Sequence, residues 1–147
     1  MVYQSAQLNV SATAFYNYIL SMIAEDVKSA TGQTVSAEKI KQGFTYVKKM
    51  KARTGVVENV DVVVSELVKD TAYTAHFTSS MGTNVTSYHI KVMNETDCKV
   101  TAGEGFTYDA TVDELAYKQP NPLAKFVIKS NQKTMLKAIE KNIKSEH

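Results

Sequence analysis

The sequence lacks several features that define specialised classes of protein. Its 147 residues contain one cysteine, Cys98, and no tryptophan. One cysteine cannot form an internal disulfide, and it has no partner at the spacing of a paired thiolate metal site. These counts exclude a disulfide-stapled scaffold and a cysteine-based metal centre. We expect no metal ion and no cofactor.

Neither sign of charge dominates the chain. Seventeen Lys and Arg stand against fifteen Asp and Glu, for a formal charge of +2. A dedicated nucleic-acid binder is usually far more basic, so we expect no nucleic-acid partner. Apolar runs stop well short of the ~20 residues that span a bilayer. Residues 1–10 also lack the basic and apolar regions of a signal peptide, so we expect a cytoplasmic protein without a membrane span.

The composition that remains is that of a globular protein. Hydrophobic residues make up 44% of the chain, enough to fill one sizeable core. We therefore expect residues 1–147 to form a single domain.

The first third of the chain predicts one strand and two helices. Val2–Val10 alternates loosely and is short enough for a strand. Ser11 is a good N-cap for a helix over Ala12–Ala30, where apolar residues recur at helical spacing. A second helix, of roughly two turns, is predicted from Ser36 to Gly43. Because it is too short to be stable alone, it must dock on another element.

Beyond the second helix the hydrophobic period changes from helical to two. Val60, Val62 and Val64, for example, fall on one face of a β-branched segment. Five strands are predicted, over residues 44–51, 56–68, 71–80, 84–95 and 98–110. Gly82 suits the tight turn between the third and fourth of these. Their short links indicate an antiparallel meander, and the strand at the N-terminus raises the count to six.

The only two prolines, Pro120 and Pro122, immediately precede the longest helical pattern. Pro122 is acceptable in a first helical turn, where its missing N–H does no harm. Two apolar stripes follow and point roughly 140° apart at 100° per residue. The first stripe holds Leu123, Phe126, Val127, Ser130 and Thr134, and the second holds Met135, Ala138, Ile139 and Ile143. We predict a kink or break within residues 129–132, capped by Ser130 or Asn131. The alternative is a helix that is buried on two sides at its start.

The order of elements identifies the fold class. Strands and helices do not alternate, so an α+β layout is favoured over a doubly wound parallel sheet. We predict a curved antiparallel sheet of about six strands that wraps around the long C-terminal helix. Two shorter helices lie between the first and second strands.

This order resembles the START-like superfamily, also called the helix-grip or birch-pollen-allergen fold. Four stretches, "SATAFYNYILSMIAEDVKSATG", "GFTYVKK", "DCKVT" and "KTMLKAIEKNI", are similar to a small uncharacterised family from Gram-positive bacteria, catalogued as a domain of unknown function. These motifs are structural and bring no active site with them. The resemblance implies a space between sheet and helix that often holds a hydrophobic ligand. It also implies that related genes can lie near sugar-phosphotransferase genes.

Aromatic and helix side chains are the first candidates for the wall of such a cavity, because ligand cavities are mostly apolar with a few aimed polar groups. The predicted lining residues are Tyr46, Tyr73, Phe77, Tyr88, Phe106, Tyr108, Phe126, Val127 and Met135. The alternative is that they form ordinary core, with their hydroxyls satisfied locally. In this fold one residue can belong to the core and also line the cavity.

Three ionisable residues are candidate polar groups of the cavity. His76 and His89 could pair across neighbouring strands, although a histidine pair alone lacks a third metal ligand or a nucleophile. Glu104 stands between Gly103 and Gly105, where a bulge could aim it inward. We favour the alternatives, in which the histidines are surface or hydrogen-bonded strand residues and Glu104 faces the solvent beside a bulge. No catalytic motif is present, so we assign no catalytic residue.

Three hypotheses for the function follow. We favour non-enzymatic binding of a small hydrophobic or amphipathic molecule between the sheet and the C-terminal helix. An alternative is a cyclase- or hydrolase-like enzyme that uses an inward-facing Glu or His. Another is an adaptor accessory to sugar uptake, acting through a helix face rich in lysine, though no protein partner is identified. Its lysines are Lys125, Lys129, Lys133, Lys137, Lys141 and Lys144.

Overall fold

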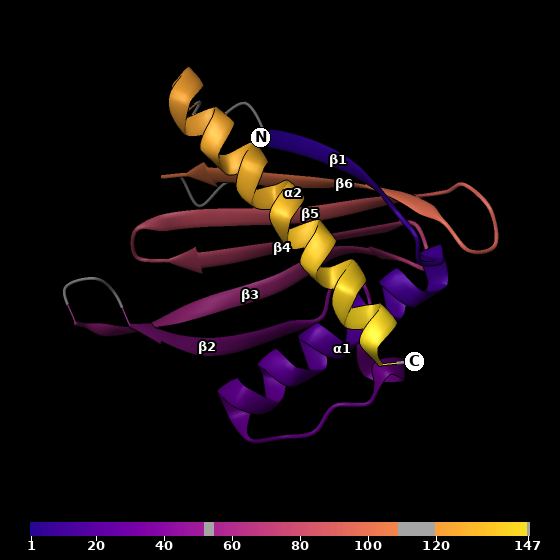
Figure 1. Ribbon diagram of the computed structural model, residues 1–147. Coiled ribbons are helices and arrows are strands. Elements are labelled where there is room, and N and C mark those ends of the chain that lie inside the picture. The colour runs from indigo at the N-terminus through magenta and orange to yellow at the C-terminus, as the bar shows by residue number, and fades with distance from the viewer. Residues whose placement is uncertain (52–54, 109–119, 147) are drawn as a thin grey trace.

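The computed structural model of the protein describes residues 1–51, 55–108 and 120–146 (Figure 1). The last two residues of the final predicted strand, 109 and 110, lie outside these ranges. The elements in chain order are β1 (Val2–Leu8), α1 (Ala12–Thr31), η1 (Ala37–Lys39), β2 (Thr45–Lys51), β3 (Val57–Val68), β4 (Ala72–Ser79), β5 (Gly82–Val92), β6 (Cys98–Thr107) and α2 (Pro122–Ser145).

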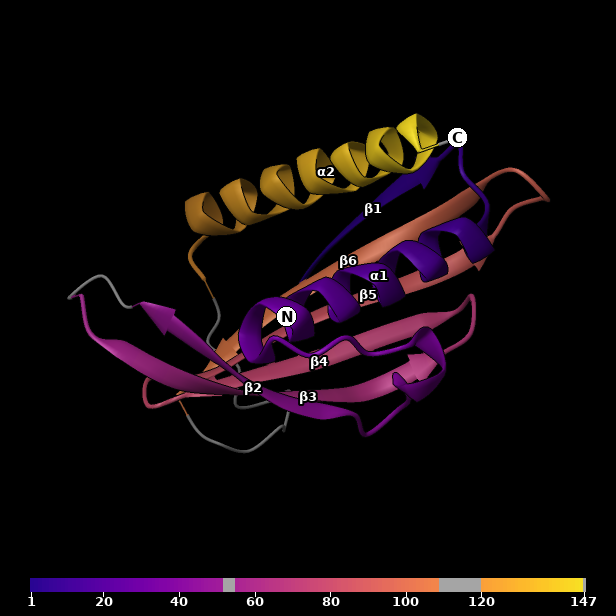
Figure 2. The same ribbon diagram turned by 90° about the horizontal axis from the view of Figure 1, so that it is seen from below.

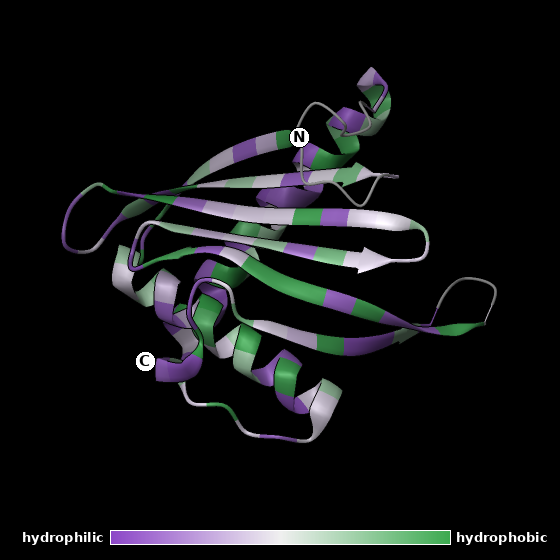
Figure 3. Cartoon of the chain, turned by 180° about the vertical axis from the view of Figure 1, so that it is seen from behind, coloured by the Kyte–Doolittle hydropathy of each residue, from purple (hydrophilic) through white to green (hydrophobic). Residues whose placement is uncertain are grey.

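The strands form one antiparallel sheet of six, in the order β1-β6-β5-β4-β3-β2. Both helices lie on the same, concave face (Figure 2), and in the view from behind the sheet stands in front of them (Figure 3). This arrangement confirms the predicted α+β class and the curved sheet that wraps the C-terminal helix. Among the described residues, no helix combines the length and apolar character needed to cross a membrane.

Alternation along the strands separates core from surface. Val60, Val62 and Val64 are buried, whereas Val63 between them is 38% exposed. Because side chains on a strand point alternately to opposite faces, this period of two assigns one row to the concave side. The largest fully buried side chain is Phe15 of α1. The core thus lies between the sheet and the helices.

The first helix matches its predicted ends closely, but the second is shorter than predicted. The Ser11 hydroxyl accepts a hydrogen bond from the Ala14 N–H at 3.0 Å, so Ser11 is the N-cap of α1. In place of two helical turns from Ser36 to Gly43, only the three residues of η1 form a 3-10 turn. A segment of this length gains few backbone hydrogen bonds for the residues it orders, so a longer helix does not form.

The terminal helix α2 runs unbroken, so the predicted break within residues 129–132 is wrong. Asn121 is its N-cap, and its side chain accepts a hydrogen bond from the Ala124 N–H. The buried residues of α2 are Gln132, Leu136, Ile139 and Ile143. They follow one helical stripe, as 100° per residue requires. Leu123 and Phe126 face away from it and are 75% and 70% exposed. The helix start is therefore not buried on two sides.

Polar side chains of α2 form hydrogen bonds with the backbone of β1 and of Asn9, which follows it. The Gln132 Nε2 donates to the Val2 carbonyl at 2.9 Å, and the Lys137 Nζ donates to the Gln7 carbonyl at 3.0 Å. The Asn9 N–H donates to the Glu140 carboxylate at 2.6 Å. These contacts join elements that are about 130 residues apart in the sequence. They also set the position of α2 along the sheet.

The row of lysines on α2 does not form one face. Each step of four residues turns the side chain by about 40° around the helix, so the row drifts by about 160° from Lys125 to Lys141. Lys137 within it is bonded to β1 and lies 3.9 Å from the Glu140 carboxylate. The residues therefore spiral from the β1 side to the outer side of the helix.

Candidate functional site

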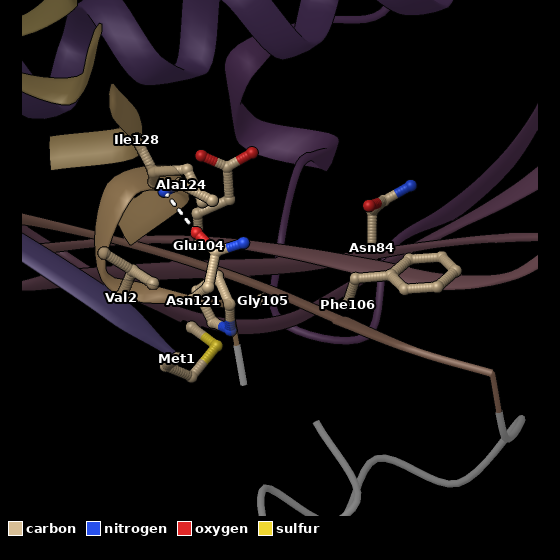
Figure 4. Close-up of a pocket in the computed structure, with 10 residues that line it drawn as sticks. Met1, Val2, Asn84, Glu104, Gly105, Phe106, Asn121, Ala124 and Ile128 are labelled. Atoms are coloured by element: carbon tan, nitrogen blue, oxygen red, sulfur yellow. Dashed lines mark hydrogen bonds between the residues drawn. The ribbon is translucent and has the colours of Figure 1, made fainter. Parts of the chain in front are cut away.

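A groove of about 500 Å³ opens between the start of α2 and one end of the concave face. Its floor comes from β1, β5 and β6 and its other wall from α2. The lining residues are Met1, Val2, Asn84, Glu104, Gly105, Phe106, Pro120, Asn121, Ala124 and Ile128. Figure 4 shows the side chains of Glu104 and Asn84 extending from the sheet in the same direction. Among the described lining residues most are apolar, and Glu104 has the one charged side chain.

Strand register explains why Glu104 points into the groove. Glu104 lies opposite Thr86 on β5 and opposite Val2 on β1, and the register is continuous on both sides. No bulge re-aims it, contrary to our prediction, because simple alternation already places it on the concave side. Its side chain is exposed to the solvent of the groove.

A second pocket, of about 130 Å³, continues from the groove along α2 and shares Glu104 with it. Gln132 and Met135 line it from the helix, and Tyr88 and Ala102 from the sheet. The Tyr88 hydroxyl donates a hydrogen bond to the Met135 sulfur at 3.5 Å. A thioether sulfur is a weak acceptor. The Oε1 atom of Gln132 is buried and has no hydrogen-bond partner among the residues that the structure describes.

A third pocket, of about 220 Å³, lies between α1 and the strands β2 and β4. The Lys48 Nζ lies 3.2 Å from the Asp26 carboxylate and 5.0 Å from the centroid of the Phe77 ring. The Tyr46 hydroxyl also donates to Asp26, and burial together with this bond raises the pKa of Tyr46. The charges at this end of the concave face are therefore matched within the protein.

Stacked tyrosines separate the second and third pockets. The rings of Tyr73 and Tyr88 lie 5.9 Å apart and are nearly parallel, and Phe15 meets Tyr88 edge-on at 5.6 Å. Such aromatic pairs add to the stabilisation from buried area. Burial, followed by the negative charge of Glu104, raises the pKa of Tyr88 to about 12. Tyr88 therefore keeps its proton at neutral pH beside a carboxylate.

Comparison with known families places the chain. A family model described as Domain of unknown function (DUF3284) matches residues 4–121. The chain belongs to this family. The match spans α1 and the sheet except for the first two residues of β1, and it ends at the N-cap of α2, so the helix that walls the groove lies beyond it. No curated protein matches the sequence significantly.

Solved structures share the fold of this DUF3284 protein across nearly its whole length. A START superfamily protein from Mycobacterium smegmatis is 10% identical, with a TM-score of 0.59 and coverage of 99% of this chain and 98% of that one. Ara h 8.0201 is 12% identical, with a TM-score of 0.58 and coverage of 97% and 96%. Norcoclaurine synthase from Thalictrum flavum is 8% identical, with a TM-score of 0.55 and coverage of 99% and 94%. At these identities the likeness shows the fold alone.

Six of the nine predicted lining residues lie on the walls of the three pockets: Tyr46, Tyr73, Phe77, Tyr88, Phe106 and Met135. The other three do not. Tyr108 is 67% exposed beyond the end of β6, and Phe126 and Val127 are 70% and 48% exposed on the outer side of α2. Helical periodicity identified both stripes of α2 but not which stripe meets the sheet.

The two histidines do not pair, and neither lies in the groove. His76 is opposite Val85, and His89 is opposite Ala72. We had placed the centre of the β4–β5 turn near Gly82, but Gly82 is already the first residue of β5 and the register is shifted accordingly. Both side chains lie on the convex face. His76 is 8% exposed there, and the His89 Nε2 lies 3.5 Å from the Glu66 carboxylate.

Sequence reasoning predicted Met135 but missed the other groove residues that α2 and its N-cap contribute. Asn121, Ala124, Ile128, Gln132 and Met135 repeat every three or four residues and so share one side of the helix. This spacing is visible in the sequence, but a search for apolar residues alone does not find it, because Asn121 and Gln132 are polar. Within the described part of the chain, no three His, Cys, Asp or Glu side chains are grouped to hold a metal ion.

Proposed function

We propose that this DUF3284 protein binds a small apolar or amphipathic molecule, without chemical conversion, in the groove between α2 and the concave face. The observation that carries the proposal is the groove itself. Its volume of about 500 Å³ lies in the range typical of small-molecule sites, and its lining is largely apolar with a few polar groups. The adjoining pocket beside Tyr88 extends the space along the helix.

A structural neighbour supports this use of the fold. The norcoclaurine synthase structure from Thalictrum flavum contains a transition-state analogue, so that protein accommodates a small organic molecule. Binding without catalysis is favoured here by the chemistry of the walls. Glu104 could act as a general base, but none of the described groove residues is a histidine, a cysteine or a serine that could act with it.

The adaptor hypothesis has less support. It requires a contiguous basic face on α2, whereas the lysines spiral around the helix and Lys137 is engaged with β1. A groove with an apolar lining, in contrast, needs no rearrangement to admit a ligand.

A dye titration with a matched pair of tryptophan variants tests the proposal. Nile red, which is uncharged and apolar, should gain fluorescence on binding the protein. Ala124→Trp adds a large ring to the groove wall and should weaken binding about tenfold or more, because the ring occupies the space that the dye needs. Ala138→Trp adds the same ring at an exposed site of the same helix and should leave binding unchanged.

Far-UV circular dichroism should show the same helix content for both variants and the parent protein. If the dye did not bind, or bound Ala124→Trp as tightly as Ala138→Trp, the groove would not be the binding site.

A further inference from the structure

The groove contains a carboxylate, that of Glu104, with which no described residue forms an ion pair. No hydrogen bond or ion pair joins the Glu104 side chain to another described residue, although apolar side chains such as Val2, Ile128 and Phe106 line the same space. Lys48, the one basic side chain among the described residues on the walls of the three pockets, is paired with Asp26 in the third of them. Met1, which carries the N-terminal ammonium, also lines the groove, but no ion pair joins that ammonium to Glu104. The exposed Glu104 carboxylate is therefore accessible to a cation from outside.

A second acceptor lies in the same pocket. The Gln132 side chain is 3% exposed, and its amide orientation follows from its bond to β1. Because the Val2 carbonyl can only accept, the Nε2 of Gln132 must face it, and the Oε1 is left without a donor. Buried polar atoms normally have a hydrogen-bond partner, so this atom indicates a donor that the described residues do not supply.

These two groups determine the chemistry of a complementary ligand. Carboxylate and amide oxygens both accept hydrogen bonds, so the matching group is rich in donors and positively charged. A protonated primary amine has three N–H donors and one positive charge, and it is small enough to lie beside a strand. A carboxylate ligand such as a fatty acid would instead be repelled by Glu104.

We infer that the ligand is an amphipathic amine, whose ammonium group is bound by the Glu104 carboxylate and the Gln132 Oε1 while its apolar body occupies the groove. This inference rests on the proposed function, and it names the class of molecule that the groove selects. The Tyr88 hydroxyl lies on the same wall and stays protonated. It adds no second negative charge to the site.

Competition between two chain-matched compounds tests the inference. n-Octylamine and 1-octanol have the same apolar chain and differ in the head group, so each should displace Nile red below the concentration at which it self-associates. The amine should compete about tenfold or more better than the alcohol, since hydrogen bonds to charged groups are the stronger kind. The advantage should shrink as salt rises, because the groove is open to solvent.

Two variants separate a local contact from general charge. Glu104→Gln keeps the shape and removes the charge, so the amine should lose its advantage while 1-octanol competes as before. Glu95→Gln changes the net charge of the protein by the same amount, but Glu95 lies in an exposed turn. This variant should therefore still bind the amine more tightly than the alcohol. Thermal melting should show that both variants remain folded.

The outcomes are distinguishable. Equal competition by the two compounds, or an advantage that survives Glu104→Gln, would overturn the amine assignment and leave the binding function standing. If neither compound displaced the dye, and the dye did not distinguish Ala124→Trp from Ala138→Trp, the proposed function would fall and the amine assignment with it.

Discussion

The docking of α2 can be tested with one substitution at two positions of the same helix. Leu136 is fully buried in the stripe that packs onto β1, whereas Leu123 is 75% exposed near the start of the helix. Leu→Ala removes the same atoms at both sites, and the change in helix propensity is the same small one. Any difference in stability between the variants therefore reports burial.

The expected magnitude follows from the burial. Three carbons at about 0.8 kcal/mol per buried CH₂ give about 2.4 kcal/mol for Leu136→Ala. The cavity left behind raises this to about 3–4 kcal/mol, because a packed core relaxes only in part. Leu123→Ala should stay within about 0.5 kcal/mol of the parent protein. At about 2–4 °C per kcal/mol, the melting temperature of Leu136→Ala should fall by about 6–16 °C.

Urea denaturation followed by circular dichroism measures both losses, provided that the slope with denaturant is unchanged. Equal losses, or a loss below about 1 kcal/mol for Leu136→Ala, would refute the argument that α2 docks through this stripe. A loss of stability confined to Leu123→Ala would mean that the stripe containing Leu123 is the buried one.

Two further predictions concern β6 and the tyrosines. A Cβ atom at Gly103 would lie 2.4 Å from the Ser87 Oγ and 2.8 Å from a ring carbon of Tyr3, so Gly103→Ala should cost about 1–3 kcal/mol. Thermal denaturation should show that adding Ser87→Ala recovers part of the loss, and an additive double variant would contradict the contact. At alkaline pH the protein should lose stability, because the pKa of Tyr88 is raised to about 12 in the folded state from its ordinary value of 10.0. The stabilisation is complete below pH ~10 and is lost as pH rises towards ~12, at about 1.4 kcal/mol per pH unit. Urea titrations across this range should show a shallower fall for Tyr88→Phe, and an identical fall would mean that Tyr88 does not contribute.

Local signals were enough to predict the sheet and the first helix. The period of two through Val60, Val62 and Val64 and the cap at Ser11 act over a few residues, so they survive any tertiary arrangement. The alternation of side chains along β6 also places Glu104 on the concave face, so the predicted bulge is not needed. Family membership and the fold agree with these local patterns.

Two predictions failed because they needed distances that no local pattern contains. The histidine pairing depended on the centre of the β4–β5 turn, and displacing that centre by two residues separates His76 from His89. The break in α2 assumed that every apolar stripe must be buried. Exposed apolar side chains such as Leu123 and Phe126 are common on protein surfaces, so the assumption does not hold.

The sequence by itself determined the order of the strands and of the two long helices, the alternation of side chains along the strands, and most of the aromatic residues on the concave side. Only the tertiary structure decided which stripe of α2 meets β1 and therefore where the groove opens. The reason is that the docking of α2 depends on contacts between residues about 130 positions apart, such as Gln132 with Val2 and Lys137 with Gln7. Those contacts place Gln132 on the wall of the same pocket as Glu104, and no periodicity along the chain could have predicted that both line it.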